Sequence, residues 1–402
     1  MCQRYKVILI VIFAVLLCSS QLYGQSKVGT AYEPDIYSPR VIALGSCGIN
    51  MVSEQSVIYN PGTLGIFHLN KTFAFSCPNK FLYLPTDYTD LYRNSMIISG
   101  GIYWKTFQPF SNSNHNFGIA FAYTRGIYES RLKLEEILSD PDIELPHDWY
   151  IDDAPVRPVD YISKTIYDYY TLALGYENGI RLGAGMTFKK VSYGSYYVDR
   201  EEENEELSDL ERHSIGAIFE IDHFLGDIKA KGWPGNHIGM TNSLAFTNTS
   251  LGEDDAGDER YAWRIGLSSR IYVSSDHINT ISLQIIFQEL KEDDFVRYFY
   301  DYDSYYEDIV SFQWQKSLGI ETMLFELVAF RVGKNEGTDR VSYGFGLSSR
   351  GLAKILDYKY GISKKHNSLS YILTHVSLNW DFARSTGLYG NRISFYKLSL
   401  SF

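Results

Sequence analysis

Four polar residues near the end of the chain are the side chains best suited to chemistry. They alternate with apolar neighbours, so they share one face of a predicted strand, and they are His375, Ser377, Asn379 and Asp381. A hydrolase needs its serine within hydrogen-bond reach of a base, whereas residues two apart in a strand lie about 7 Å apart. The sequence also shows no partner that would orient the His375 ring. The set is better explained as part of a polar lumen, and we expect no enzyme.

Acidic runs are the second feature that could do chemistry. Residues 201–206 and 253–255 are rich in carboxylates, which are ligands for Ca²⁺. Neither run has the spaced oxygen ligands and glycine turn of a defined calcium loop, so both are better interpreted as solvated loops. The chain also shows no phosphate-binding loop, dinucleotide fingerprint, zinc spacing or basic nucleic-acid patch. We therefore expect no cofactor, no metal and no nucleic-acid partner.

The first 24 residues have the form of a secretory signal peptide. Arg4 and Lys6 precede an apolar run at 7–17, which is short for a bilayer span, and small and polar residues lead to Gly24. A lipoprotein signal ending at Cys18 is the alternative, but a bulky leucine stands where such signals need a small residue. No later stretch approaches the roughly 18 apolar residues of a membrane helix.

Two cysteines remain after the predicted signal peptide, Cys47 and Cys77. A chain exported from the cytoplasm enters a compartment that permits disulfides. The two residues form either a bridge or a pair of small side chains that happen to be cysteines, and the sequence leaves both arrangements open.

Bulky apolar residues alternate with small or polar residues from about residue 71 to the end. For example, Leu182, Met186 and Phe188 alternate with Gly183 and Lys189. The clearest runs are 117–124, 180–189, 263–268, 341–348 and 376–382. These strands, of roughly 10 to 15 residues, exceed the 5 to 6 usual in soluble sheets and suit a tilted bilayer crossing of 9 to 11.

The predicted connections alternate between short and long. Short turns are expected at 177–179, which carries an Asn-Gly hairpin signal, and at 274–277 and 349–351. Long polar connections are expected near 78–94, 128–164, 199–211, 251–258 and 292–310. Segments 129–160, 199–211, 251–260 and 291–310 hold 30 of the 48 acidic residues, so the net charge of −11 says little about partners. Short turns at one end and long loops at the other are typical of outer-membrane barrels.

These patterns predict an all-β fold, a transmembrane antiparallel β-barrel of about 14 strands (range about 12–16) over residues 71–402. We find about 15 candidate strands, but a single-chain barrel of this class has an even number. A soluble secreted β-sandwich that binds ligands is the rival fold. The barrel predicts a bacterial outer-membrane location, with outer-membrane lipid as its surroundings.

The C-terminal residues continue the alternation to the last position. Tyr396, Leu398, Leu400 and Phe402 point one way, and the residues between them point the other. An ending of this kind resembles the C-terminal signature of bacterial outer-membrane proteins. That resemblance implies an assembly signal and a partner, the barrel-assembly machinery.

A motif at 40–64 precedes the strands. Its distinctive residues are Arg40, Leu44, Gly45, Gly48, Tyr59, Asn60, Pro61, Gly62 and Leu64. Pro61 should end a helix at Asn60, and Gly45 and Gly48 allow close backbone approach. We expect residues 25–70 to form a short helical plug in the lumen, where bases such as Arg181, Lys189 and Arg264 would hydrogen-bond Asn60 or the helix ends. A periplasmic linker helix is the alternative.

This motif resembles the N-terminal segment of the FadL-type superfamily and its PorV-like branch, although Ser46, 53–55 and Thr63 depart from the pattern. Residues 318–333, 343–347 and 356–360 resemble the last hairpins of PorV-like barrels. The resemblance implies two roles. The first is porin-like passage of hydrophobic small molecules through a gated lumen, and the second is handling of secreted protein cargo, as in type IX secretion or surface attachment.

Overall fold

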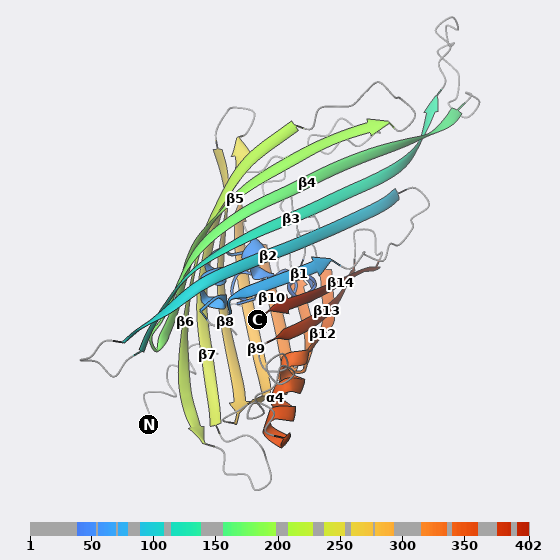
Figure 1. Ribbon diagram of the computed structural model, residues 1–402. Helices are drawn as coiled ribbons and strands as arrows, with labels where there is room; N and C mark the ends of the chain where they lie inside the picture. The colour runs from blue at the N-terminus through green and yellow to red at the C-terminus, as the bar shows by residue number, and fades with distance from the viewer. Residues whose placement is uncertain are drawn as a thin grey trace, which may run out of the picture.

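The computed structural model describes residues 38–53, 55–69, 71–78, 89–107, 114–137, 156–197, 208–227, 237–253, 259–275, 278–292, 315–335, 340–360, 376–386 and 392–401. At some strand ends it describes the backbone alone. These residues form fourteen antiparallel strands that close into one barrel. Each strand pairs with its neighbours in sequence, and the first pairs with the last, so the predicted barrel of about 14 strands is confirmed (Figure 1).

The barrel is tall on one side and short on the other, because β2 to β9 have 14 to 24 residues and the remaining strands have 6 to 10. The strands are β1 (Phe73–Pro78), β2 (Thr89–Phe107), β3 (Asn114–Ile137), β4 (Val156–Glu177), β5 (Ile180–Tyr197), β6 (Ser208–Asp227), β7 (His237–Glu253), β8 (Glu259–Ser274), β9 (Asn279–Glu292), β10 (Gln315–Leu324), β11 (Val328–Asn335), β12 (Arg340–Ser348), β13 (Ser377–Thr386) and β14 (Arg392–Ser401). The helices are α2 (Pro39–Ala43), η1 (Ser56–Ile58), α3 (Gly62–Phe67) and α4 (Ser349–Tyr360). Among the described residues, every helix is too short or too polar to span a membrane.

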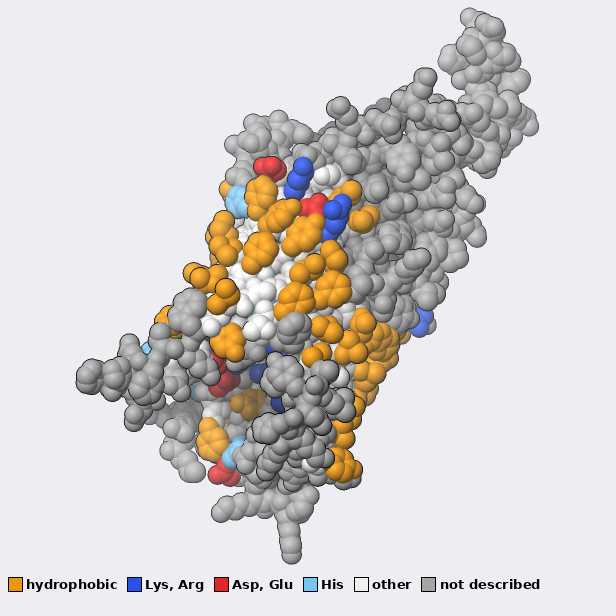
Figure 2. Space-filling model, viewed as in Figure 1, with side chains coloured by type: hydrophobic (Ala, Val, Ile, Leu, Met, Phe, Trp, Pro, Cys, Tyr) orange, Lys and Arg blue, Asp and Glu red, His pale blue; other side chains and the backbone are white. Residues whose placement is uncertain are grey.

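The two faces of the strands differ as the alternation predicts. On β5, Met186 is 55 % exposed and faces outward, whereas Thr187 and Lys189 are 2 % and 3 % exposed and face the lumen. Hydrophobic side chains cover much of the visible outer wall (Figure 2). Exposed apolar residues on other strands include Ile102, Phe121, Leu174, Leu244, Ile265 and Phe330. The barrel is therefore apolar outside and polar inside.

Short turns gather at one end of the barrel. There the strands are joined by 108–113, 178–179, 228–236, 275–278 and 325–327, and by the segment that contains α4. We call this the short-turn end. The opposite end has the long connections 138–155 and 293–314, together with shorter ones such as 336–339, and only the segment that contains α4 is longer than these two.

The expected long connection at 128–164 is shorter than predicted. β3 continues to Ile137 and β4 begins at Val156, so much of that acidic segment is strand. The backbone register places residues of opposite charge at facing positions of the two strands. The pairs are Glu129 with Lys164, Lys133 with Asp160, and Glu136 with Arg157.

The turn expected at 349–351 is wrong, because these residues begin α4. Residues 356–360, which we assigned to a closing hairpin, lie in the same helix. The reason is the spacing of Leu352, Ile355 and Leu356, which recur at three and four residues and so favour a helix over a strand. The helix also binds the barrel, since Lys354 forms an ion pair with Glu326 at 2.7 Å.

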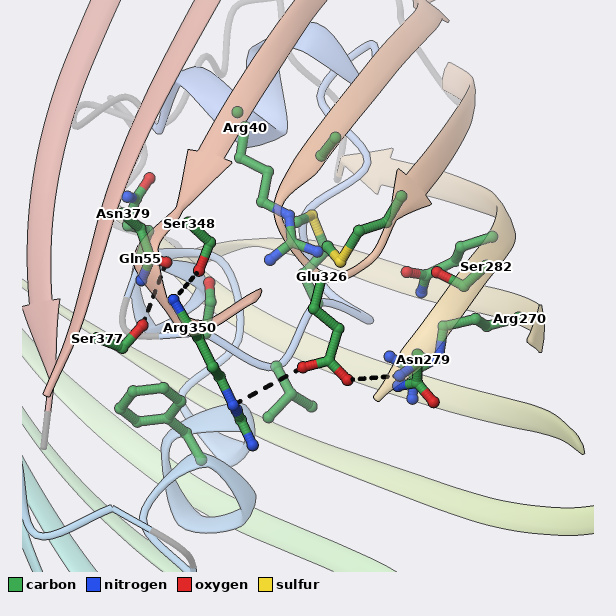
Figure 3. A pocket seen from close by; sticks show the side chains of 18 of the residues that line it. Arg40, Gln55, Arg270, Asn279, Ser282, Glu326, Ser348, Arg350, Ser377 and Asn379 are labelled. Carbon is green, nitrogen blue, oxygen red and sulfur yellow. Dashed lines mark hydrogen bonds and ion pairs between the residues drawn. The ribbon is translucent and has the colours of Figure 1, made fainter. Parts of the chain in front are cut away.

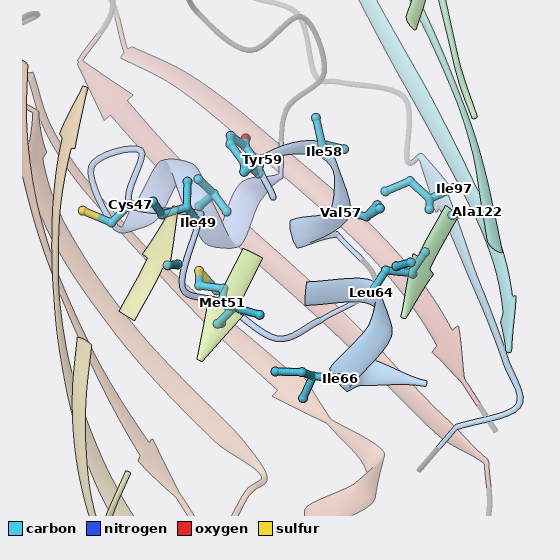
Figure 4. Close-up of a cluster of buried hydrophobic side chains, with 14 of the residues drawn as sticks. Cys47, Ile49, Met51, Val57, Ile58, Tyr59, Leu64, Ile66, Ile97 and Ala122 are labelled. Atoms are coloured by element: carbon cyan, nitrogen blue, oxygen red, sulfur yellow. The ribbon is translucent and has the colours of Figure 1, made fainter. Parts of the chain in front are cut away.

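Residues 38–69, which we call the N-terminal segment, lie inside the barrel. α2 packs against β11 to β14, and α3 packs against β3 to β6 on the other side of the lumen. Val41, Leu44, Ile49 and Leu64 are each 1 % exposed or less. They form one cluster with small residues of the barrel wall such as Ala122 (Figure 4). The segment therefore spans the lumen from wall to wall.

The predicted assembly signal lies on β14. Leu398 and Leu400 are more exposed than Ser399 and Ser401, which are 2 % and 3 % exposed and face the lumen. The Tyr396 side chain and Phe402 lie outside the described part of the chain, as does the expected signal peptide at 1–24.

Candidate functional site

The Asn60-Pro61-Gly62 motif begins a helix, although the sequence predicted that it ends one. Pro61 precedes the first residue of α3, where a missing backbone N–H costs nothing. The Asn60 side chain accepts from the Gly62 N–H at 2.9 Å, which is a capping bond. Its amide nitrogen donates to the carbonyl oxygens of Ile49 at 2.9 Å and Ala217 at 3.1 Å. These carbonyl groups, and not the expected luminal bases, hold Asn60 in place.

Glycines on the inner wall receive the backbone of the N-terminal segment. A Cβ added at Gly175 would overlap the carbonyl group of Gly65, and one added at Gly183 would overlap that of Gly62. On the opposite wall, a Cβ at Gly333 would overlap the peptide between Leu44 and Gly45. Gly45 also has a φ of +65°, which favours glycine. The segment is therefore fitted to the wall without room for side chains between them.

A buried chain of charges ties the N-terminal segment to β10, β11 and β13. Arg40 of α2 donates to both oxygens of Glu321, at 3.0 and 2.7 Å. Arg331 donates to Glu321 at 2.6 Å and to Asp381 at 2.7 Å, and Gln55 lies 3.5 Å from Asp381. The side chains of Glu321 and Arg331 are each 4 % exposed. Two basic and two acidic groups balance, which is what buried charges require.

Cys47 is a free cysteine, so the bridge to Cys77 that the sequence left open does not form at this residue. Its Sγ lies 3.8 Å from the carbonyl oxygen of Ile286, and burial raises the pKa of the thiol. A protonated, buried thiol is chemically inert. Beside it, the backbone N–H of Gly48 donates to the Gln288 side chain at 3.1 Å, which fixes this turn to β9. The side chain of Cys77 lies outside those described.

Tyr59 closes the same part of the N-terminal segment. Its ring lies against Gly48, where an added Cβ would meet the ring at 2.7 Å, and its hydroxyl accepts from the Ser38 N–H at 3.3 Å. All six residues of the predicted plug motif thus take part in packing within the segment or against the wall.

His68 fastens the end of α3 to β2. Nδ1 lies 2.7 Å from the Lys71 carbonyl oxygen and Nε2 lies 3.0 Å from Ser99 Oγ. A carbonyl group only accepts, so Nδ1 carries the proton and Nε2 accepts from the Ser99 hydroxyl. Burial lowers the pKa of His68 below its ordinary value, and the bond to Lys71 offsets this only in part. The docked segment therefore holds His68 neutral.

We predict that acid weakens docking of the N-terminal segment at His68. The free imidazole takes up a proton at higher pH than the docked one, so its stabilising effect is complete above about pH 6.5 and is lost as the pH falls. Below that pH, the stability that docking gains from His68 falls by up to about 1.4 kcal/mol per pH unit, until the pH reaches the pKa of the docked His68. Folded barrels of this kind migrate on a gel as a separate, heat-modifiable band. The measurement is the urea concentration at which half of this folded band is lost, taken between pH 5 and 8. His68→Gln should remove this part of the pH dependence. If the urea midpoints of wild type and His68→Gln change in parallel with pH, the prediction is wrong.

A polar cavity of about 700 Å³ lies between the N-terminal segment and the short-turn end. Its lining includes Arg40 and Gln55 of the segment, Arg270 of β8, Glu326 of the turn after β10, and Arg350 of α4 (Figure 3). It is bounded by the N-terminal segment on one side and by turns and α4 on the other.

Three of the four residues that first suggested chemistry lie in the described part of the chain. Ser377 Oγ donates to Asn379 at 3.3 Å, Asp381 is bound to Arg331, and His375 lies outside the described residues. Residues 201–206 also lie outside them. Within the described ranges, His, Cys, Asp and Glu side chains form no group of three that could hold a metal ion.

Comparison with known proteins identifies no family for this chain. No family model and no curated protein matches the chain. The transport unit of the autotransporter AIDA-I from Escherichia coli is similar over 82 % of this chain and 88 % of that chain, at 11 % identity and a TM-score of 0.35. A deltaS2S3 mutant of the monoaromatic hydrocarbon channel TodX is similar over 91 % of this chain and 97 % of that chain, at 9 % identity and a TM-score of 0.36. These neighbours are outer-membrane β-barrels, and TM-scores this low carry no argument about function.

Proposed function

We propose that this chain is an outer-membrane β-barrel whose lumen, closed by the N-terminal segment, forms a gated path for small molecules. The observation that carries the proposal is the closed barrel with apolar residues outside and polar residues inside. Such a barrel satisfies its backbone hydrogen bonds without free edges, which a bilayer requires. The expected signal peptide at 1–24 and the assembly signal ending at Phe402 belong to the same proposal.

The gating part of the proposal rests on how the N-terminal segment is held. Its contacts are of two kinds: close packing against wall glycines such as Gly175, and polar bonds such as that from Arg40 to Glu321. Close packing favours a segment that stays in place. The charged bonds, which border the polar cavity, are the contacts that a solute or partner could exchange, so they are where we place the gate.

Protein export is the second candidate function, and the height of the barrel favours it. β3 and β4 have 24 and 22 residues, whereas a bilayer crossing takes about 9 to 11. Strands of this length raise one wall beyond the membrane, where it could receive a secreted protein. The two functions differ in how the open lumen should behave. A channel should conduct small ions without a partner protein, whereas a barrel for protein export need not.

Reconstitution tests the proposed membrane channel. In liposomes, the intact chain should float with the lipid, keep a heat-modifiable β structure, and release a trapped small solute slowly but faster than protein-free liposomes. Slow release is expected because the N-terminal segment fills most of the lumen. A chain that stays folded and monodisperse without detergent, and does not float, would be a soluble barrel and would contradict the membrane proposal. Release as fast as through an unobstructed barrel would contradict the plug.

A further inference from the structure

The cavity next to the short-turn end carries an excess of positive charge. Of the described residues that line it, seven are basic and three are acidic. Most of the basic groups have carboxylate partners: Arg40 and Arg331 share Glu321 and Asp381, and Arg181 lies within 3.3 Å of Glu220. The excess is found elsewhere, where α4 meets the turn after β10.

Two basic side chains of α4 share one carboxylate there. Lys354 donates to both oxygens of Glu326, at 2.8 and 2.7 Å, and the same carboxylate accepts from the backbone N–H of Asn279 at 3.2 Å. Arg350 Nε is 3.8 Å from Glu326, which is too long for a hydrogen bond. Within the described part of the chain, the Arg350 guanidinium makes no hydrogen bond, and its side chain is 55 % exposed. Its donors are free to receive an acceptor from the cavity.

Arg270 faces the same cavity from β8. Its guanidinium lies 5.8 Å from the centre of the Tyr272 ring, and Nη2 lies 3.4 Å from Thr241 Oγ1. Among the described residues it has no carboxylate within ion-pair distance. Figure 3 shows Arg270 and Arg350 on opposite sides of Glu326. An acceptor in the cavity would thus have a guanidinium group on either side.

The turn that carries Glu326 is a tight hairpin turn, in which the Leu327 N–H donates to the Leu324 carbonyl oxygen at 2.9 Å. Phe325 and Glu326 have φ values of 52° and 51°, a region that residues other than glycine rarely adopt. A type I′ hairpin turn requires positive φ at both of its central residues, so the turn geometry accounts for these values. In this turn the Glu326 carboxylate accepts from Lys354, and the Arg350 guanidinium is left without a hydrogen bond.

We propose that this cavity binds a small polar anion through carboxylate or phosphate oxygens, with Arg350 as its main ligand and Arg270 facing it. Guanidinium groups bind both oxyanions with paired hydrogen bonds. The inference rests on the proposed function and deepens it, because it names the class of solute that would enter the lumen. It also replaces the hydrophobic solute that the family resemblance implied, since an apolar solute would leave these charges desolvated and without a partner.

Calorimetric titration of the detergent-solubilised full chain tests this, with succinate and inorganic phosphate as probes and succinamide as the uncharged control. One or both anions should bind, and succinamide should not. The anion that binds more tightly shows whether the cavity prefers carboxylate or phosphate oxygens. Arg350→Gln should weaken binding roughly tenfold, the equivalent of one charge-assisted contact, and Arg350→Lys should weaken it less. Arg125→Gln removes a basic side chain from the outer face of β3, 44 % exposed, and should leave binding unchanged.

Three outcomes would overturn the inference. They are no binding of either anion to folded protein, equal binding by wild type and Arg350→Gln, and much tighter binding of octanoate than of succinate. Arg350 is exposed, so its variants should keep the heat-modifiable fold, which gel migration checks. Calorimetry measures binding without transport. A barrel that binds succinate but never conducts would refute the channel alone, and a conducting barrel that binds neither anion would refute this inference alone.

Discussion

Deleting residues 26–66 should raise the conductance of the barrel in planar bilayers from near zero to that of an open pore. The deletion removes α2 and most of α3, which pack against opposite sides of the inner wall. The wall residues that face them are mostly small, such as Ala122, Gly175 and Gly183, so the wall cannot close the gap. A barrel of about eight strands is filled by its own side chains, whereas one of fourteen is wide enough to leak.

The strands should survive this deletion, because each pairs with two other strands and none pairs with the N-terminal segment. Far-UV circular dichroism and heat-modifiable migration of the truncated chain check this, with the full-length chain prepared identically as the control. A truncated barrel that is folded but conducts no better than the intact one would show that the segment is not a plug. The gating part of the proposal would then lose its structural support.

The sequence predicted which way side chains point better than it predicted where chain segments meet. Alternation is a local property, so Met186 and Lys189 could be assigned to opposite faces from their types alone. The Glu321–Arg331 contact was missed, although a signal existed. Once the three-residue turn at 325–327 is located, the hairpin register places these two residues opposite each other. Their meeting with Arg40 depends on how deep α2 sits in the lumen, which no local pattern encodes.

The two wrong helix assignments have local causes. Pro61 was taken to end a helix, but proline is equally suited to the start of one, and only the Asn60 cap shows which applies here. At 349–351, Ser-Arg-Gly resembles a turn. The helix that begins there, α4, has only 12 residues, so its helical pattern is short. In both places the local sequence is compatible with two structures, and the coordinates show which of them forms.

Replacing Glu321 by alanine should destabilise the barrel by about 3–5 kcal/mol, the usual cost of breaking a buried ion pair. Arg331 would keep only Asp381 as a partner, and its charge is too deeply buried to be hydrated. Arg40 would lose its carboxylate as well, although its side chain, 21 % exposed, can turn toward the cavity. The measurement is the urea midpoint of the heat-modifiable band. As the matched control, Asp227→Asn breaks an exposed pair with His237 and should cost less than about 1 kcal/mol.

A double variant separates the buried charge from simple loss of contacts. Arg40→Leu with Glu321→Leu removes one basic and one acidic group together and leaves the Arg331–Asp381 pair balanced. It should recover most of the stability lost in Glu321→Ala, because the cost comes from an uncompensated charge. If the double variant is instead at least as unstable as the single one, the network contributes by packing. If Glu321→Ala also gives brief full openings in planar bilayers while Asp227→Asn does not, then the charges that bind Arg40 are the fastening that keeps the N-terminal segment in the lumen.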